Sequence, residues 1–258
     1  MGVQIFSLEG KNILVTGAST GLGAAAAEGF ARAGAAMVGV HYNRSQEEAE
    51  ATVTRVEAAG SKAVLLQADI TQEDQAKAMA ARFVEAAGGV MHVLMNNAGA
   101  SGPWCKLEDM STELWRQVFA LNVDSLMWIS QACLPALKAA RGATIINVGS
   151  TAGRNGGGPG GVTYASAKGT VHVLTMGWSK ELAPDKIRVN AVAPGVLETP
   201  FHEGQLTPER WVEIAKTTPL LRNGTAEDIV GACIMMASDA SAFMTGETID
   251  INGGRWFH

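Results

Sequence analysis

The sequence has few of the features that mark secreted, disulfide-stabilised or membrane-spanning proteins. It contains only 3 cysteines in 258 residues, at positions 105, 133 and 233. Their odd number and the lack of a Cys-x-x-Cys pair exclude a disulfide framework, and we predict no metal centre. No apolar run is long enough to span a bilayer. Residues 1–10 lack the basic and apolar regions of a signal peptide, so we expect a cytoplasmic protein.

The chain also has only a small excess of one charge sign over the other. Lys and Arg number 20 against 25 Asp and Glu, a net charge of −5. The chain therefore has no basic surplus for nucleic acid or an anionic membrane surface, and we expect neither as a partner. Hydrophobic residues, by contrast, make up 47% of the chain and charged residues 17%. This balance is typical of a parallel sheet that helices cover on both faces.

Short β-branched segments alternate with longer segments of helical periodicity along nearly the whole chain. We predict strands at residues 12–16, 36–42, 63–67, 92–96, 144–148, 188–193 and 248–251, and helices at 23–33, 46–58, 73–86, 114–140 and 164–182. Such alternation predicts an α/β fold with a doubly wound parallel sheet. No linker divides the chain, so residues 1–258 are predicted to form one domain. Residues 194–223 interrupt the alternation with several prolines and are predicted to be a substrate-capping loop.

A glycine-rich turn, residues 16–23, lies between the first predicted strand and the first predicted helix. Glycines there let the backbone approach a pyrophosphate, and the helix N-terminus offers unpaired N–H groups. The spacing is G-x-x-x-G-x-G, and glycine-rich turns also close ordinary strand–helix units. We predict a dinucleotide site. Its predicted contacts in the turn are Gly17, Ser19, Thr20, Gly21, Leu22 and Gly23.

The end of the second predicted strand indicates which dinucleotide is bound. An acidic residue there binds the free 2′-hydroxyl of NAD, but this chain has His41 or Tyr42 at that position. Asn43 and Arg44 follow, and an arginine can pair with the 2′-phosphate of NADP. We therefore favour NADP(H), with NAD(H) as the alternative. Arg44 could instead be a solvated residue at the start of the next helix.

Two further strand ends are predicted to line the dinucleotide, because ligands of open parallel sheets lie beyond the carboxyl ends of the strands. Asp69 and Ile70 follow the third strand, and the Asp69 carboxylate could accept a bond from an adenine amino group. It could equally be the N-cap of the next helix. Asn97, Ala98 and Gly99 follow the fourth strand and are predicted to lie beside the cofactor.

Tyr164 and Lys168 lie one turn apart on a predicted helix, so the phenol and the ammonium face the same way. Ser150 lies just beyond the end of the preceding predicted strand, and a glycine-rich loop connects the two elements. A helical Tyr/Lys pair is common by chance. Its position after the glycine turn, in a chain with only 2 tyrosines, makes it a candidate for proton transfer.

These motifs, in this order and across residues 8–254, resemble the short-chain dehydrogenase/reductase family. The resemblance implies a Rossmann-type fold and hydride transfer between a carbonyl and an alcohol. It implies that Tyr164 exchanges the proton and that Ser150 binds the substrate oxygen. Lys168 would lower the phenol pKa and hold the nicotinamide ribose, and Asn122 would hold a water that links Lys168 to solvent. It also implies cofactor contacts from Tyr164, Lys168, Pro194, Gly195, Val196 and Thr199.

The ammonium is expected to bring the phenol pKa from about 10 toward about 7, which needs on the order of 4 kcal/mol. Spacing leaves two candidates for the catalytic hydroxyl, because Ser150 lies one position farther from Tyr164 than in related 3-oxoacyl-thioester reductases. Strict counting would select Thr151. The pattern Gly149-Ser150-x-x-Gly153 favours Ser150.

The predicted substrate residues are Trp104, Ser150, Arg154 and His202, with Phe201 and Trp211 as further candidates for the pocket wall. Arg154 and His202 could bind a carboxylate or hydroxyls, so we expect a small polar substrate such as a sugar, a polyol or a sugar acid. A 3-oxoacyl thioester is the alternative within the enzyme class. In another class, the chain could be a sensor or scaffold that binds NADP(H) without turnover.

The predicted helices at 114–140 and 164–182 carry apolar residues on more than one side. A helix of this kind is deeply buried or meets a partner. In the family that the chain resembles, these two helices form a four-helix contact across a two-fold axis. We therefore expect a homotetramer, with a dimer as the alternative.

Overall fold

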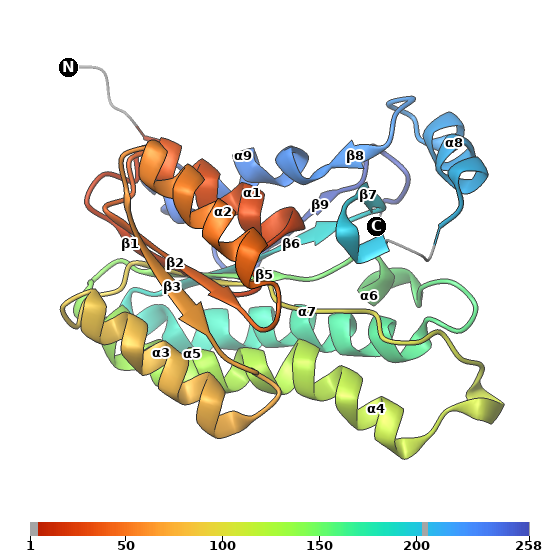
Figure 1. Cartoon of the computed structure of the whole chain (residues 1–258), viewed down its shortest axis with the longest axis horizontal. Helices are drawn as coiled ribbons and strands as arrows, with labels where there is room; N and C mark the ends of the chain where they lie inside the picture. Colours follow the sequence, from red (N-terminus) through yellow and green to blue (C-terminus); the bar gives the residue numbers. More distant parts are fainter. Residues whose placement is uncertain (1–4, 203–205, 258) are drawn as a thin grey trace.

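Seven parallel strands form the central sheet of the molecule, in the order β3-β2-β1-β4-β5-β6-β9 (Figure 1). The computed structural model describes residues 5–202 and 206–257. The strands are β1 (Asn12–Val15), β2 (Met37–Tyr42), β3 (Lys62–Gln67), β4 (Val93–Asn96), β5 (Thr144–Val148), β6 (Arg188–Pro194) and β9 (Thr248–Ile251). The chain runs outward from β1 to β3 and returns to the other side of β1 with β4. The predicted doubly wound sheet is therefore confirmed, and its topological switch point lies between β1 and β4.

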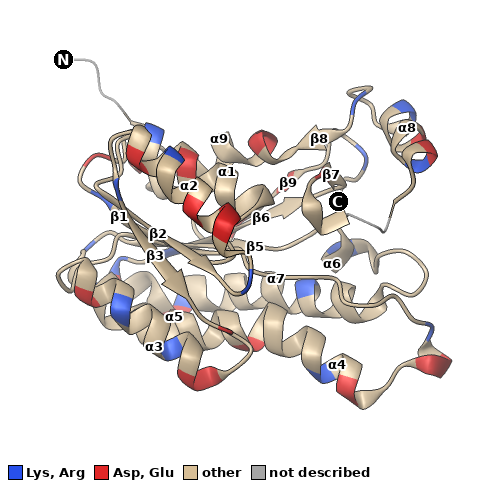
Figure 2. Cartoon of the chain, in the orientation of Figure 1, with Lys and Arg blue, Asp and Glu red and all other residues tan. Residues whose placement is uncertain are grey.

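Helices cover both faces of the sheet (Figure 1). One layer holds α1 (Gly21–Arg32), α2 (Gln46–Ala58) and α9 (Val230–Ala237), and the other holds α3 (Glu73–Ala86), α5 (Ser125–Ala139) and α7 (Val162–Leu182). Each face has its own apolar core, with Phe30 central to the first and Phe83 to the second. Acidic and basic residues are interspersed along the outer helices (Figure 2). Within the described residues, no helix is both long and apolar enough to cross a membrane.

The single helix predicted for residues 114–140 is wrong. The chain instead forms α4 (Thr112–Phe119), a π-helical segment (Ala120–Asp124) and then α5. In the π segment the Asn122 amide Nδ2 donates to the carbonyl oxygens of Val118 and Ala100, at 2.9 Å in each case. A polar side chain thus bonds the helix backbone at the point where the regular pattern of helical hydrogen bonds changes. Short π-helical segments of this kind are frequent at functional sites.

The segment predicted as a capping loop, 194–223, contains a helix, and the sequence signals for it were misread as interruptions. It holds β7 (Leu197–Glu198), a 3₁₀ turn (Pro200–His202) and α8 (Pro208–Thr217). Thr207 caps α8 by accepting a bond from the Arg210 amide, and Pro208 occupies the first helical position, where its missing N–H costs nothing. β7 pairs with β8 (Gly224–Thr225). The prediction also missed α9, a short apolar helix without polar periodicity.

Candidate active site

The turn between β1 and α1 requires glycine at several positions. Gly17 and Gly21 have φ angles of 61° and 55°, in the left-handed region that side chains disfavour. A Cβ on Gly17 would lie 2.9 Å from Ala98 Cα, and a Cβ on Gly23 would collide with the Gly17 carbonyl. The turn therefore packs directly on the residues that follow β4.

Side chains from β1, β2 and the end of β4 hold this turn in place. Asn97 Nδ2 donates to the carbonyl oxygens of Thr16 (2.8 Å) and Gly17 (2.9 Å). The Thr16 hydroxyl accepts from the amides of Asn97 and Ala98. His41 Nδ1 accepts the Gly17 N–H at 3.0 Å. Neither hydrogen bond to the turn was predictable from the sequence, in which Thr16 is only the first residue of the glycine-rich turn and His41 only a position without an acid.

Both ring nitrogens of His41 are hydrogen-bonded inside the protein. Only 2% of it is exposed, and its Nε2 bonds the Ala68 carbonyl at 3.2 Å while Nδ1 bonds Gly17. Burial lowers the pKa of His41 to about 4, against the smaller raising effect of the Ala68 bond. The imidazole is therefore neutral at pH 7. Its Nδ1 thus binds the turn, and its Nε2 binds the residue that follows β3.

The N-terminus of α1 fits an anionic group. Its N-cap, Thr20, makes no side-chain capping bond within the described residues, and the first turn carries no acidic side chain. The amides at this end are thus available to a phosphate, and the helix dipole favours a negative charge there. A groove of about 560 Å³ runs beside the turn, and its lining includes Ser19, Thr20, Gly21 and Thr199.

The residues predicted to hold the adenosine end lie in two turns. Asn43 and Arg44 are exposed between β2 and α2. Asp69 Oδ1 accepts bonds from the Thr71 amide (3.1 Å) and hydroxyl (2.7 Å). It closes this turn and is not the N-cap of α3, which is Gln72, so that alternative is wrong. Ile70 is 2% exposed and packs in the second core.

The end of β5 and the first turns of α7 bring Ser150, Tyr164 and Lys168 together. Lys168 Nζ donates to the Val148 carbonyl at 2.7 Å and lies 5.7 Å from the centroid of the Tyr164 ring. The Tyr164 phenol bonds the Ser150 hydroxyl, which also accepts the Ala152 amide at 3.1 Å. Thr151 begins the short helix α6 (Ala152–Asn155) as its N-cap. Of the two hydroxyls, the structure thus pairs Ser150 with the phenol.

Asn122 lies against the same group. Its amide nitrogen bonds the backbone, and its Oδ1 is buried without a partner among the described residues. A Cβ on Gly99 would meet Asn122 Oδ1 at 2.6 Å and Lys168 Nζ at 3.2 Å, so both side chains converge on this glycine. An unpaired buried acceptor beside an ammonium is a suitable place for a bridging water.

The pKa of the phenol departs from the sequence expectation. Burial raises the pKa of Tyr164 to about 12, and the bond with Ser150 opposes this rise. Burial also lowers the pKa of Lys168 to about 8, so the ammonium is still largely charged at pH 7. Desolvation of the phenolate thus outweighs the bond with Ser150. The predicted pKa near 7 is therefore not a property of these side chains by themselves.

Aromatic rings from the capping segment extend from Tyr164. The ring centroids are 5.5 Å apart for Tyr164 and Phe201, 5.0 Å for Phe201 and His202, and 5.8 Å for His202 and Trp211. Burial lowers the pKa of His202, so its ring is neutral at pH 7. Trp104 is 54% exposed and lies over the glycine-rich loop, with ring atoms 3.2 Å from a Cβ built on Gly158.

The Arg154 guanidinium, which we predict to contact the substrate, is bonded to β9 within the protein. Its Nη2 donates to the Thr248 carbonyl at 3.2 Å, and its Nε lies 3.6 Å from the Asp250 carboxylate. The guanidinium is thus directed to β9. The sequence could not show this, because 94 positions separate Arg154 from its backbone partner.

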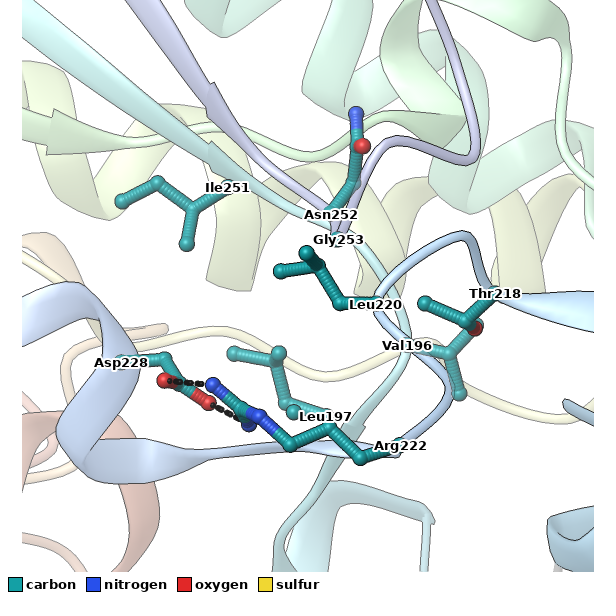
Figure 3. Close-up of a pocket in the computed structure, with 10 residues that line it drawn as sticks. Val196, Leu197, Thr218, Leu220, Arg222, Asp228, Ile251, Asn252 and Gly253 are labelled. Atoms are coloured by element: carbon teal, nitrogen blue, oxygen red, sulfur yellow. Dashed lines mark hydrogen bonds and ion pairs between the residues drawn. The ribbon is translucent and has the colours of Figure 1, made fainter. Parts of the chain in front are cut away.

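A smaller cavity of about 110 Å³ lies between the end of β9 and the segment after α8 (Figure 3). Figure 3 shows the bidentate pair of Arg222 and Asp228 at one side and Leu220 near the centre. Val196, one of the predicted cofactor contacts, lines this cavity together with Asn252. Gly195 donates its N–H to the Ile251 carbonyl. This cavity contains neither Ser150 nor Tyr164, so it is separate from the reacting group.

Comparison with known proteins decides the family. A family model described as enoyl-(acyl carrier protein) reductase matches residues 17–255. The chain belongs to the short-chain dehydrogenase/reductase family. It is 37% identical to the 3-oxoacyl-[acyl-carrier-protein] reductase of Thermotoga maritima, covering 96% of this chain and 98% of that one. It is 34% identical to L-rhamnose 1-dehydrogenase (NAD(P)(+)) of a Sphingomonas species, covering 96% and 97%.

Among solved structures, a 7α-hydroxysteroid dehydrogenase in complex with NADH and a 7-oxo bile acid superposes with a TM-score of 0.92 at 31% identity, covering 98% of this chain and 97% of that one. The family assignment and the predicted Rossmann-type fold are thereby confirmed. The chain is an oxidoreductase of this family. Its relatives act on thioesters, sugars and steroids, so the family does not determine the substrate.

Proposed function

We propose that the protein interconverts a carbonyl and a secondary alcohol, with Tyr164 as the group that exchanges the proton. The observation that supports this most strongly is the convergence of Ser150, Tyr164 and Lys168 where β5 ends, next to a glycine turn built for an anion. A sensor or scaffold that binds a dinucleotide without turnover would need the turn but not the paired hydroxyls.

In reduction, Tyr164 gives its proton to the substrate oxygen while the Ser150 hydroxyl bonds the same oxygen. Lys168 stabilises the phenolate that forms, and Asn122 Oδ1 with the Lys168 ammonium holds the water through which the proton is replaced. When bound, the dinucleotide supplies the hydride in this direction and accepts it in the other. Oxidation requires the phenolate and is therefore favoured at high pH.

The cofactor that we propose is NADP(H). The α1 N-terminus, Thr199 and the residues after β4 would hold the phosphates and nicotinamide, and Arg44 with Asn43 would bind the 2′-phosphate. The buried, neutral His41 leaves no acid at the end of β2 to accept a bond from a 2′-hydroxyl. Substituting Arg44 by Ala should raise KM for NADPH about tenfold or more and leave KM for NADH unchanged. A tenfold preference of the unaltered enzyme for NADH would contradict the proposal.

The substrate that we propose is small, polyhydroxylated and uncharged, a sugar or polyol rather than a sugar acid. Arg154 is bonded to β9, and the described wall beside Tyr164 consists of Phe201, His202 and Trp211. Aromatic faces suit the C–H surfaces of sugars, and a neutral imidazole can bond a hydroxyl. Residues 194–223 would cap this pocket.

A substrate panel tests this proposal against its main alternative. Aldoses, polyols, the matching sugar acids and a 3-oxoacyl thioester are compared by kcat/KM with both dinucleotides. We expect neutral sugars or polyols to exceed the matching acids at least tenfold. Preference for the thioester, which one relative's activity supports, would replace the substrate assignment and keep the reaction. Turnover of none of them would favour the sensor.

We further propose that the chain assembles as a homotetramer. Apolar side chains on α7 remain uncovered in the single chain, with Val173 63% and Met176 48% exposed. Beyond the end of β9, the chain also exposes Trp256 (51%) and Phe257 (85%). Two separate apolar surfaces suit two different two-fold contacts, which together give a tetramer.

A further inference from the structure

Three side chains of α7 contact Val148, the last residue of β5, or Ser150, two positions beyond it. Tyr164, Lys168 and His172 are spaced by four residues, so they form one continuous row along the helix. Tyr164 bonds the Ser150 hydroxyl, and Lys168 bonds the Val148 carbonyl. His172 Nε2 lies 3.1 Å from the Ser150 carbonyl oxygen. The third member of the row has no part in the proton transfer described above.

The approach of His172 to Ser150 is specific. The imidazole is 8% exposed, and a Cβ on Gly149 would lie 2.8 Å from its Nε2. Only glycine at 149 leaves this space. A carbonyl oxygen accepts and does not donate, so the hydrogen bond requires a proton on His172 Nε2.

The peptide that follows Ser150 is held from two sides. Its carbonyl oxygen accepts from the Gly153 amide at 3.0 Å as well as from His172. The Ala152 amide bonds the Ser150 hydroxyl from the same short turn. The orientation of the hydroxyl toward Tyr164 thus depends on this turn. Among the described residues, His172 is the only one whose side chain donates to the Ser150 carbonyl.

We propose that His172 is a positioning residue, which fixes the Ser150 peptide so that the serine hydroxyl faces the Tyr164 phenol. Arg154 and Asp250 support it from the side of β9. The side chains of this pair are 28% and 19% exposed, and Arg154 also bonds the Thr248 carbonyl, so α6 is tied to β9 just beyond Ser150. This inference rests on the catalytic roles proposed for Ser150 and Tyr164.

Burial and the surrounding charges together lower the pKa of His172, so its imidazole is neutral at pH 7. Burial is the main cause that lowers the pKa of His172, and the bond to Ser150 opposes it. Arg154 of α6 and Lys168 of α7 lower the pKa further, and Asp250 of β9 raises it. Because Nε2 carries a proton in both the neutral and the charged ring, the bond to Ser150 persists through this titration.

Two substitutions separate donation from packing. His172→Leu removes the donor, and His172→Gln keeps an N–H that can reach the Ser150 carbonyl. We expect His172→Leu to lower kcat about tenfold while KM for the dinucleotide changes less than twofold. The Ser150 bond lowers the phenol pKa, so loss of its alignment should also move the pH profile of alcohol oxidation to higher pH. His172→Gln should restore both quantities to within about threefold of the unaltered enzyme.

His92 supplies the matched control. It is also partly buried and bonds a backbone group, the Asn12 amide, through Nδ1 at 3.0 Å, but at the opposite end of the sheet. His92→Leu should reduce stability without altering kcat or the pH profile. If His172→Gln is as impaired as His172→Leu, or if neither variant moves the pH profile, the positioning role is refuted.

A measurement without substrate keeps this inference distinct from the proposed function. In ¹⁵N-labelled protein, the imidazole nitrogen shifts report which nitrogen carries the proton, and His172 is assigned by the signal lost in His172→Gln. We expect the Nε2–H tautomer at pH 7. A proton on Nδ1 alone would overturn the inference and leave the proposed reaction standing. A protein that turns over no substrate yet shows Nε2–H would instead contradict the proposed reaction.

Discussion

Acid should destabilise the protein through one buried side chain, His41, which supports the glycine turn. Protonation of Nδ1 would remove the acceptor for the Gly17 N–H and place a charge where only 2% of the residue meets solvent. The pKa of His41 is about 4 in the folded protein and 6.5 when free, with burial as the main cause. The folded protein therefore favours the neutral ring.

The sign and size of the effect follow from this difference. The pKa is depressed in the folded state, so the stabilisation is complete above pH 6.5 and is lost as the pH falls toward 4. One pH unit corresponds to about 1.4 kcal/mol, so the free energy of unfolding should fall by about 3 kcal/mol across this window. That is a substantial share of the about 5–15 kcal/mol that a domain has in total.

Urea unfolding between pH 7 and pH 4 measures this loss. The matched variant is His41→Asn, whose amide oxygen can accept the Gly17 N–H but cannot be protonated in this range. His92, His172 and His202 also have lowered pKa values, so the wild type alone would combine several titrations. The difference between wild type and variant isolates His41. Between pH 7 and pH 4, the unfolding free energy of the wild type should fall by about 3 kcal/mol more than that of the variant. A difference between the two proteins that is constant with pH would refute the reasoning.

Three other outcomes are expected. Gly23→Ala should abolish dinucleotide binding and lower Tm, because its Cβ would collide with the Gly17 carbonyl and lie 2.5 Å from Asn97 Nδ2; unaltered binding by calorimetry would refute this packing. Ser150→Ala should lower kcat about 10²-fold or more and Thr151→Ala less than threefold, and the reverse order in steady-state rates would assign the hydroxyl to Thr151. Light scattering at micromolar concentration should give the mass of four chains, and a stable species of 26.9 kDa would exclude assembly.

Local patterns predicted the sheet because strand–helix alternation is encoded in short spacings, whereas the resemblance to a known family identified the reacting group. All seven predicted strands occur, and α7 places Tyr164 and Lys168 one turn apart as their separation by four residues requires. The glycine turn was predictable for the same reason, since the constraint lies within eight consecutive residues.

What the sequence did not predict depends on contacts between distant segments. The change of helix type at Asn122 arises from its bonds to Val118 and Ala100, which apolar periodicity does not encode. The bond of Arg154 to the Thr248 carbonyl could not be predicted, because the two residues lie 94 positions apart in the chain. The pKa of Tyr164 was misjudged because the extent of its burial is a property of the folded protein. α8 is a different case, since its Thr-Pro start was visible and was misinterpreted.

The central claim is that Tyr164 exchanges the proton during hydride transfer. It is tested most directly by comparing wild type and Tyr164→Phe in NADPH-dependent reduction of the best substrate, followed by the absorbance of NADPH. The Phe ring keeps the packing against Phe201 and loses the proton. We expect kcat to fall by about 10²–10⁴-fold or more while the dissociation constant for NADPH stays within about threefold. Retention of more than about a tenth of the wild-type kcat, with NADPH binding intact, would contradict the account.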